Sequence, residues 1–306
     1  MNKTAINNLG LSQLKQPSLS YEPFQFKRQL QANCTHLLGF EFDGTACFRK
    51  GASKGPDEIR KQSPGIETYS PYLDEDTEDI NVVDLGNLPV GLTNNIESNW
   101  QQANDCFFSI IKGVNLCTQQ IRFLTMGGEH SISYAPIVSY LKQYPDLLLI
   151  HLDAHADLRD GYEGYHYSHA SIIRRVWEQM QDKHTLYQYG IRSGTRDEYA
   201  WMKQQDTLIS TREKLLQQLA KVDEQRPIYL TLDLDYFDPA FFPGTGTPEP
   251  GGEDFHSFVQ ICKILKHKNL VGADVVELAP EIDSTENSSV FAAKVVRELL
   301  LVLETN

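Results

Sequence analysis

Two apolar runs of the chain end in acidic and imidazole side chains placed at every second position. These side chains are His151, Asp153, His155 and Asp157 in HLDAHADLRD, and Asp233 and Asp235 in PIYLTLDLD. Alternate residues of an extended chain share one face, so each set can converge on one point. Carboxylates gathered in this way repel, by about 4 kcal/mol per pair at ~4 Å and an effective dielectric near 20. Two divalent cations would cancel that repulsion, and the pattern therefore predicts a two-metal hydrolytic site.

Two further apolar runs end in residues of the same chemical kind. His130 follows IRFLTM, and Glu277 lies near the end of a later run. A lone Asp or His at such a position is usually solvated or caps a helix, but the whole set favours a metal site. His151 shares the alternation yet lies deeper in its run, and we interpret it as a buried, hydrogen-bonded histidine rather than a ligand.

The elements that must position these residues alternate along the chain. Strands are expected at 35–42, 80–86, 121–130, 146–155, 185–193, 227–235 and 270–280, with amphipathic helical stretches between them, including one region at 195–222. Continuous apolar strands alternating with helices predict a parallel sheet covered on both faces, in one three-layer domain. Residues at the carboxyl ends of such strands face the crevice where ligands bind. Residues 1–33 are weakly patterned and are expected to form an arm on the 34–306 domain or on a neighbouring subunit.

Composition excludes several classes of protein. A net charge of −13 over 306 residues disfavours nucleic-acid and anionic-membrane partners, which require basic surface. Five scattered cysteines without a CxxC pair predict neither a disulfide framework nor a structural zinc site, and they fit a reducing compartment. No secretory signal and no long apolar segment is visible. We therefore expect a soluble, cytoplasmic enzyme.

Five motifs together resemble one known family. They are GGEHS (127–131), DAHADLRD (153–160), SHAS (168–171), DLDYFDPAFFPGTGTPEPGG (233–252) and DVVELAP (274–280). In this order they are similar to the ureohydrolases, the arginase and agmatinase family, from about residue 36 to the C-terminus. The resemblance implies a single three-layer α/β/α domain with a mostly parallel eight-stranded sheet. It also implies a homo-oligomer, either a trimer or a hexamer.

The resemblance further implies two manganese ions in each subunit. Carried over by motif position, their ligands would be His130 and Asp157 on the first ion, His155 and Asp235 on the second, and Asp153 and Asp233 bridging both. A hydroxide between the ions would attack the guanidinium carbon of the substrate. A carboxylate-rich site with two imidazoles and no thiolate also suits manganese better than zinc.

Family motifs also suggest which residues handle the substrate. Glu277 would bind the guanidinium group, because a carboxylate can accept two parallel N–H bonds, and Thr247 would be a second contact. His169 in SHAS would carry the proton to the leaving amine, as its pKa suits that task. His166, three residues earlier, is the rival, and only the resemblance separates the two.

The far end of the substrate is the open question. The segment LRDGYEGYHYSHAS carries Asp160 and Glu163 among tyrosines, which suits a cationic amine on an aliphatic tether and is similar to the agmatinase branch. The alternative is that these are ordinary solvated loop residues. Lys50 departs from the family, where a proline often precedes the glycine, and this leaves the shape of that loop open.

We expect the reaction to be hydrolysis of agmatine, a small cationic guanidino compound, to putrescine and urea. The nearest alternatives are guanidinobutyrate, guanidinopropionate or another guanidino compound as substrate. More remote alternatives are a metal-dependent deacetylase and a non-catalytic scaffold. All six expected ligands are present in the sequence, which argues against the scaffold.

Overall fold

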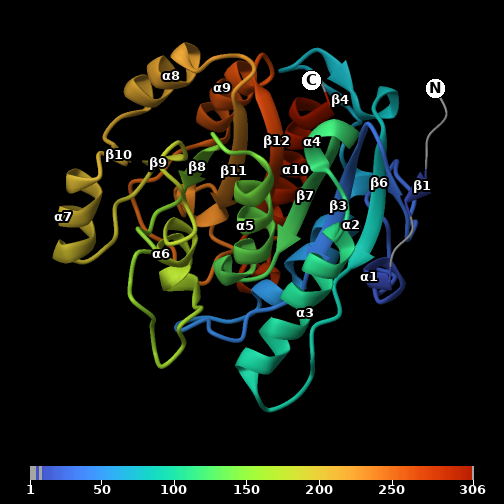
Figure 1. Ribbon diagram of the computed structural model, residues 1–306, viewed down its shortest axis with the longest axis horizontal. Coiled ribbons are helices and arrows are strands. Elements are labelled where there is room, and N and C mark those ends of the chain that lie inside the picture. Colours follow the sequence, from blue (N-terminus) through green and yellow to red (C-terminus); the bar gives the residue numbers. More distant parts are fainter. Residues whose placement is uncertain (1–4, 7–8, 305–306) are drawn as a thin grey trace.

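The computed structural model describes residues 5–6 and 9–304, and a single eight-stranded sheet forms its centre (Figure 1). The strand order is β10-β9-β8-β11-β12-β7-β3-β6, and every neighbouring pair is parallel. The strands are β3 (Cys34–Phe40), β6 (Val82–Asn87), β7 (Ile121–Gly127), β8 (Leu148–Leu152), β9 (Thr185–Tyr189), β10 (Leu208–Ile209), β11 (Pro227–Asp233) and β12 (Asn269–Val276). The expected parallel sheet of eight strands is confirmed.

Helices cover both faces of this sheet, because its central strands are apolar on both sides. In β8, Leu148, Ile150 and Leu152 pack into one apolar cluster, and Leu149 packs into the other. The principal helices of the first face are α2 (Gly55–Gln62), α8 (Arg212–Lys221), α9 (Phe255–Leu265) and α10 (Asn287–Glu304). Those of the second are α3 (Ile96–Ile111), α5 (Tyr134–Gln143) and α6 (Ile172–Trp177). Three layers result, as expected.

Within the described part of the chain, none of the helices combines the length and apolar character that crossing a membrane would require.

The region expected to be helical over 195–222 is interrupted. It contains α7 (Arg196–Gln204), the two-residue strand β10, and then α8. The break between α7 and β10 contains Asp206, whose backbone φ of +52° cannot continue a helix. The prediction of one helical region was therefore wrong, because the pair Leu208–Ile209 is too short to produce a visible strand pattern.

The first turn of α7 also holds in place the loop that follows β8, which carries candidate site residues. Thr195 and Glu198 form a capping box, in which each side chain accepts from the other residue's backbone N–H. Glu198 is buried, and its second oxygen accepts from the backbone N–H of Leu158 (3.0 Å). The helix start therefore anchors the segment that follows β8.

The described residues before β3 lie against the rest of the same chain. Leu11 and Leu14 are buried, and Tyr21 donates from its hydroxyl to the Ala293 carbonyl of α10 (2.9 Å). The backbone N–H of Tyr21 also donates to Asp84 of β6 (3.1 Å), whose carboxylate is paired with buried Arg60 (2.8 Å). The division into an arm at 1–33 and a domain at 34–306 stays a prediction.

Candidate active site

Four neighbouring strands in the middle of the sheet deliver the site residues. In the order β8-β11-β12-β7, their carboxyl ends carry Asp153, Asp233, Glu277 and His130. His130 opens a short 3-10 helix, η4 (His130–Ser133), after β7. Because parallel strands end at one edge, residues more than a hundred positions apart in the sequence meet there.

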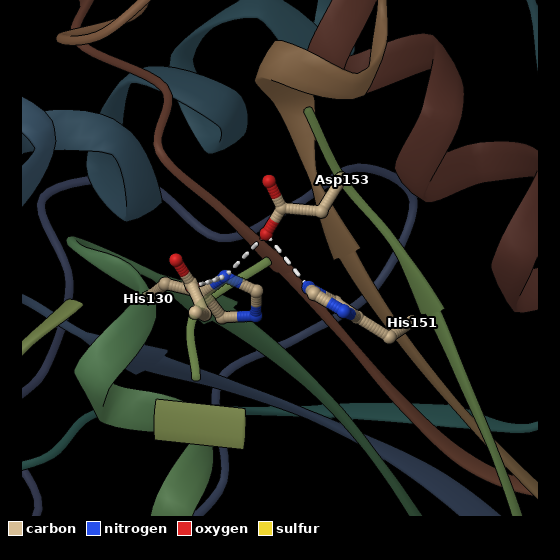
Figure 2. A group of neighbouring side chains, drawn as sticks. His130, His151 and Asp153 are labelled. Atoms are coloured by element: carbon tan, nitrogen blue, oxygen red, sulfur yellow. Dashed lines mark hydrogen bonds and ion pairs between the residues drawn. The ribbon is translucent and has the colours of Figure 1, made fainter. Parts of the chain in front are cut away.

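The ring nitrogen Nδ1 of His130 lies among three carboxylates. It is 3.0 Å from Asp153 Oδ2, 3.1 Å from Asp157 Oδ2 and 3.3 Å from Asp233 Oδ2. It is buried, and it has no partner in hydrogen-bond geometry among the described residues. Figure 2 shows His130 and His151 approaching the Asp153 carboxylate from separate directions. Three carboxylate oxygens therefore lie close to a ring nitrogen that is hydrogen-bonded to none of them.

Hydrogen bonds on the far side of the ring decide which nitrogen of His130 carries the proton. The Thr231 hydroxyl donates to Asp274 (2.6 Å), so its oxygen can accept from His130 Nε2–H (2.9 Å). Asp274 is fully buried and also accepts from Ser133 and Tyr229. Nδ1 is thus left with its lone pair directed at the three carboxylates, which is the arrangement of a metal ligand.

A second cluster adjoins the first and shares Asp153 with it. His155 Nδ1 lies 2.9 Å from Asp235 Oδ2 and 3.6 Å from Asp153 Oδ1. Asp153 therefore presents Oδ2 to the first cluster and Oδ1 to the second. Such a shared carboxylate is how two-metal sites hold their ions at a short separation.

The two-residue spacing in the sequence motifs orients these carboxylates locally. The backbone N–H of His155 donates to Asp153 Oδ1 (2.5 Å), and that of Asp235 donates to Asp233 Oδ1 (2.8 Å). Both are turns in which an aspartate accepts from the backbone two residues on. Each bond engages Oδ1 and directs Oδ2 of the aspartate toward His130 Nδ1, which lies 3.0 Å from Asp153 Oδ2 and 3.3 Å from Asp233 Oδ2.

The pKa shifts of the clustered residues show that their carboxylates need positive charge nearby. Burial and the neighbouring Asp153 raise the pKa of Asp157 to about 6, and burial with nearby carboxylates raises the pKa of Asp233. Burial lowers the pKa of His130 and His155, but the surrounding carboxylates outweigh it and raise both pKa values overall. Protons and cations therefore compete for the same positions. The oxygen-rich donor set with two imidazoles fits a pair of hard divalent cations.

Two functional carboxylates lie on strained backbone. Asp157 has a φ of +54° and Glu277 a φ of +67°, in the left-handed region that side chains other than glycine seldom adopt. Hydrogen bonds hold both residues there: Arg174 N–H donates to the Asp157 carbonyl, and Glu277 N–H donates to the Gly128 carbonyl. Gly128 itself must be glycine, because an added Cβ would lie 1.9 Å from the Phe42 carbonyl oxygen. Strain of this kind is typical of functional positions.

A cavity of about 280 Å³ opens above the two clusters. Glu277, Thr247 and His169 line it together with metal-type residues of both clusters. Glu277 is buried, and its Oε1 accepts from the backbone N–H of His130 (2.8 Å). Burial and the adjacent Glu129 raise the pKa of Glu277, as expected of a carboxylate that lacks a cationic partner. The cavity has the size of a small-molecule site.

The remaining expected site residues lie outside this cavity. Asp160 is exposed and pairs with Arg175 (2.6 Å), and Arg175 also contacts the ring of His166 (2.7 Å). Glu163 lies on the same exposed loop. Of the two candidate histidines, the structure places His169 in the cavity wall. Substrate contacts of Asp160 and Glu163 stay predictions.

Sequence reasoning gave no role to Arg159, which lines the cavity, or to Arg49, which holds a neighbouring loop. Arg159 lines the mouth of the cavity and stacks over Tyr162, with its guanidinium carbon 4.6 Å from the ring centre. Arg49 donates to the carbonyls of Thr245 (2.7 Å) and Gly246 (3.1 Å), which ties the loop after β3 to the loop carrying Thr247. No spacing rule could have identified these loop contacts.

The loop around Lys50, where the sequence departs from the family, has a defined shape. Lys50 Nζ donates to the Gly44 carbonyl (3.2 Å), and the backbone N–H of Gly51 donates to Asp43 (2.8 Å). Both bonds close the loop on itself, so a lysine in place of proline is accommodated.

His151 supports Asp153 from beneath the first cluster. Its Nε2 lies 2.7 Å from Asp153 Oδ2, and its Nδ1 accepts from the Gln188 amide (3.2 Å). The Gln188 oxygen in turn accepts from the Thr207 hydroxyl (2.9 Å), which fixes the orientation of the amide. Nε2 therefore carries the proton and donates to the carboxylate. His151 lies close enough to His130, Asp153 and Asp157 to be a fourth cation ligand, so its interpretation as a hydrogen-bonded histidine stays a prediction.

Replacing His151 should weaken cation binding without removing a ligand. We expect His151→Phe to lower Mn²⁺ affinity by about 10- to 100-fold, as is usual when a group that orients a ligand is lost. Titrating the metal-free protein by calorimetry measures this. His184→Phe is the matched control, because His184 is a buried histidine bonded to the Tyr144 carbonyl away from the clusters. Equal Mn²⁺ affinity in both variants would show that His151 has no such role.

Comparison with known proteins agrees with this geometry. A family model described as the arginase family matches residues 34–302. The agmatinase of Bacillus subtilis (strain 168) is 39% identical over 272 residues, covering 87% of this chain and 90% of that protein. The guanidinobutyrase of Pseudomonas aeruginosa is 32% identical over 299 residues, covering 91% and 89%.

Among solved structures, a putative agmatinase from Clostridium difficile superposes with a TM-score of 0.80. It is 36% identical in sequence, and the match covers 89% of this chain and 97% of that one.

Proposed function

This chain belongs to the arginase family and is a ureohydrolase of guanidino compounds, and we propose that it hydrolyses agmatine to putrescine and urea with two Mn²⁺ ions. The observation that carries the proposal is the pair of clusters sharing Asp153 below a cavity whose wall contains Glu277. Bound in this site, the two ions would lower the pKa of water and make it a nucleophile near neutral pH.

The ligands of the two ions are proposed from the contacts of the described residues. His130 and Asp157 would hold the first ion, His155 and Asp235 the second, and Asp153 and Asp233 would contribute to both. Support comes from the Nδ1 atoms of both histidines, each of which lies within about 3 Å of carboxylate oxygens.

Glu277 is proposed to bind and orient the guanidinium group. As a buried carboxylate in the cavity wall it lacks a cationic partner among the described residues, and a planar cation can donate two parallel N–H bonds to it. The Thr247 hydroxyl is the proposed second contact; it donates to Asp235 (3.4 Å), and Arg49 holds the loop that carries it. Holding the cation in this way directs its central carbon toward the clusters.

His169 is proposed to transfer the proton to the leaving amine. Burial, followed by charge on His155 and His130, lowers the pKa of His169 to about 4, below the near-neutral pKa expected from the sequence. Its imidazole is therefore neutral at pH 7 and can take up a proton from the attacking water. The same ring then gives that proton to the departing nitrogen, which would otherwise leave as an unstable anion.

A second candidate substrate is a guanidino acid such as guanidinobutyrate. Arg159 at the cavity mouth favours it, because this guanidinium has no acidic partner within the described residues and would attract a carboxylate. The higher identity to the agmatinase relative than to the guanidinobutyrase relative favours agmatine.

Urea release over a panel of substrates separates these candidates. With Mn²⁺ loaded, we expect kcat/KM for agmatine to exceed that for guanidinobutyrate, guanidinopropionate, guanidine and arginine by about tenfold or more. A higher value for guanidinobutyrate would overturn the choice of agmatine and leave the reaction class intact. In that case Arg159→Gln should lower kcat/KM for the acid alone. Amine release from acetylputrescine instead of urea release would indicate a deacetylase.

The active metal and the assembly are further proposals. The choice of manganese is supported by the type of the ligand atoms in the site. Comparing the activity of the metal-free enzyme after loading with Mn²⁺, Fe²⁺ or Zn²⁺ tests this choice.

We propose that the protein forms a trimer or hexamer in the cytoplasm. Its five unpaired cysteines are typical of a reducing compartment. Most side chains of α10 are already buried within the chain, which leaves this helix little surface for a partner. Light scattering measures the assembly.

A further inference from the structure

Glu129 is a buried carboxylate beside the cavity that belongs to neither cation cluster. It accepts the Thr45 backbone N–H (2.7 Å) on one oxygen, and the hydroxyls of Thr45 and Ser131 (2.6 Å from Ser131) on the other. Three donors thus converge on it, and two of them come from one residue. Glu129 therefore fixes both the backbone and the side chain of Thr45.

The Thr45 hydroxyl also faces the proposed proton carrier. Its oxygen accepts from the backbone N–H of His169 (3.2 Å) and lies 3.3 Å from Nδ1 of the His169 ring. A hydroxyl has one proton, and here that proton is donated to Glu129. Toward His169 the Thr45 oxygen can then only accept, so Nδ1 must carry the hydrogen.

The other ring nitrogen of His169 is consequently the one with a lone pair. Nε2 has no hydrogen-bond partner among the described residues, and the ring lines the cavity. Tyr162 packs edge-on against the ring, with centroids 5.7 Å apart and planes at 86°, and restricts its rotation. The tautomer and the orientation of His169 are therefore both determined by its neighbours.

We propose that Thr45, with Glu129 behind it, is a positioning residue that presents Nε2 of His169 to the reacting groups. The arrangement parallels the use of a carboxylate to orient a catalytic imidazole, with a threonine hydroxyl placed between the two. This inference rests on the proposed role of His169. In addition, proton transfer would depend on a hydroxyl group from the loop after β3. No sequence motif linked this loop to the SHAS segment.

Variants of Thr45 measure this effect. Thr45→Val keeps the shape of the side chain and removes the hydroxyl, and we expect kcat to fall by about 10- to 100-fold. KM and the number of bound Mn²⁺ ions should stay within about twofold of wild type. Thr45→Ser should restore most of kcat. Thr77→Val, at a buried threonine distant from the cavity, is the matched control and should leave kcat unchanged.

A double-mutant cycle shows whether Thr45 acts through His169 or only holds its loop in place. In a His169→Asn background, we expect Thr45→Val to have no further effect on kcat, because its target is gone. An equal fractional loss in both backgrounds would overturn the inference and leave the role of His169 intact. Full activity of His169→Asn alone would instead overturn the proposed proton carrier.

Discussion

Asp153→Asn should leave the enzyme unable to hold its pair of cations and should reduce urea formation by roughly 10³-fold or more. Asp153 is the residue whose two oxygens face different clusters, one toward His130 and one toward His155. Asparagine keeps the size of the side chain but offers only one oxygen and no charge. A single substitution therefore removes the Asp153 ligand atom from one cation position and leaves the other with an uncharged oxygen at most.

Metal content and turnover must both be measured on this variant. After Mn²⁺ loading and dialysis, we expect about two ions per chain in the wild type and fewer than about one in Asp153→Asn. Asp146→Asn is the matched control, because Asp146 is exposed near the opposite end of the same strand. Full metal content with full turnover in Asp153→Asn would rule out a bridging role.

Glu277→Gln should separate substrate binding from metal binding. The glutamine can still accept from the His130 backbone, so the fold around the clusters is retained, but it carries no charge to balance a guanidinium ion. Losing one partner of a buried charge pair typically costs about 2–5 kcal/mol. We therefore expect kcat/KM for agmatine to fall by about 10³-fold, with the number of bound Mn²⁺ ions unchanged.

The control for this change lies four residues further along the chain. Glu281 is exposed and forms a surface pair with Lys54, and Glu281→Gln should therefore leave kcat/KM unchanged. A Glu277→Gln enzyme that keeps kcat/KM within about tenfold of wild type would show that the guanidinium group is held elsewhere.

Most of the fold could be predicted because its strands are buried on both faces. Strands such as β7, β8 and β11 are continuous apolar runs, and such runs followed by helices indicate a parallel sheet. β10 was missed because its two residues provide no pattern. The arm was recognised only as weakly patterned, since its packing depends on isolated side chains such as Leu11 and Leu14.

The residues of the clusters were predictable for a local reason. The spacing of two lets a backbone N–H orient Asp153 and Asp233, so the motif itself carries the geometry. Contacts made by loops carry no such signal. Arg159 and Asp160 are neighbours in the sequence, yet one lines the cavity and the other pairs with Arg175, and only the path of the loop decides between them.

The left-handed backbone at Asp157 and Glu277 bears on how this protein could evolve. In a duplicated gene copy that is no longer selected for catalysis, glycine at these two positions would relieve the backbone strain, because glycine adopts a positive φ without steric cost. Such a copy would lose its chemistry while its fold became easier to maintain. Loss of activity through these two substitutions would therefore lower the conformational energy of the backbone. Only selection for the reaction product would act against it.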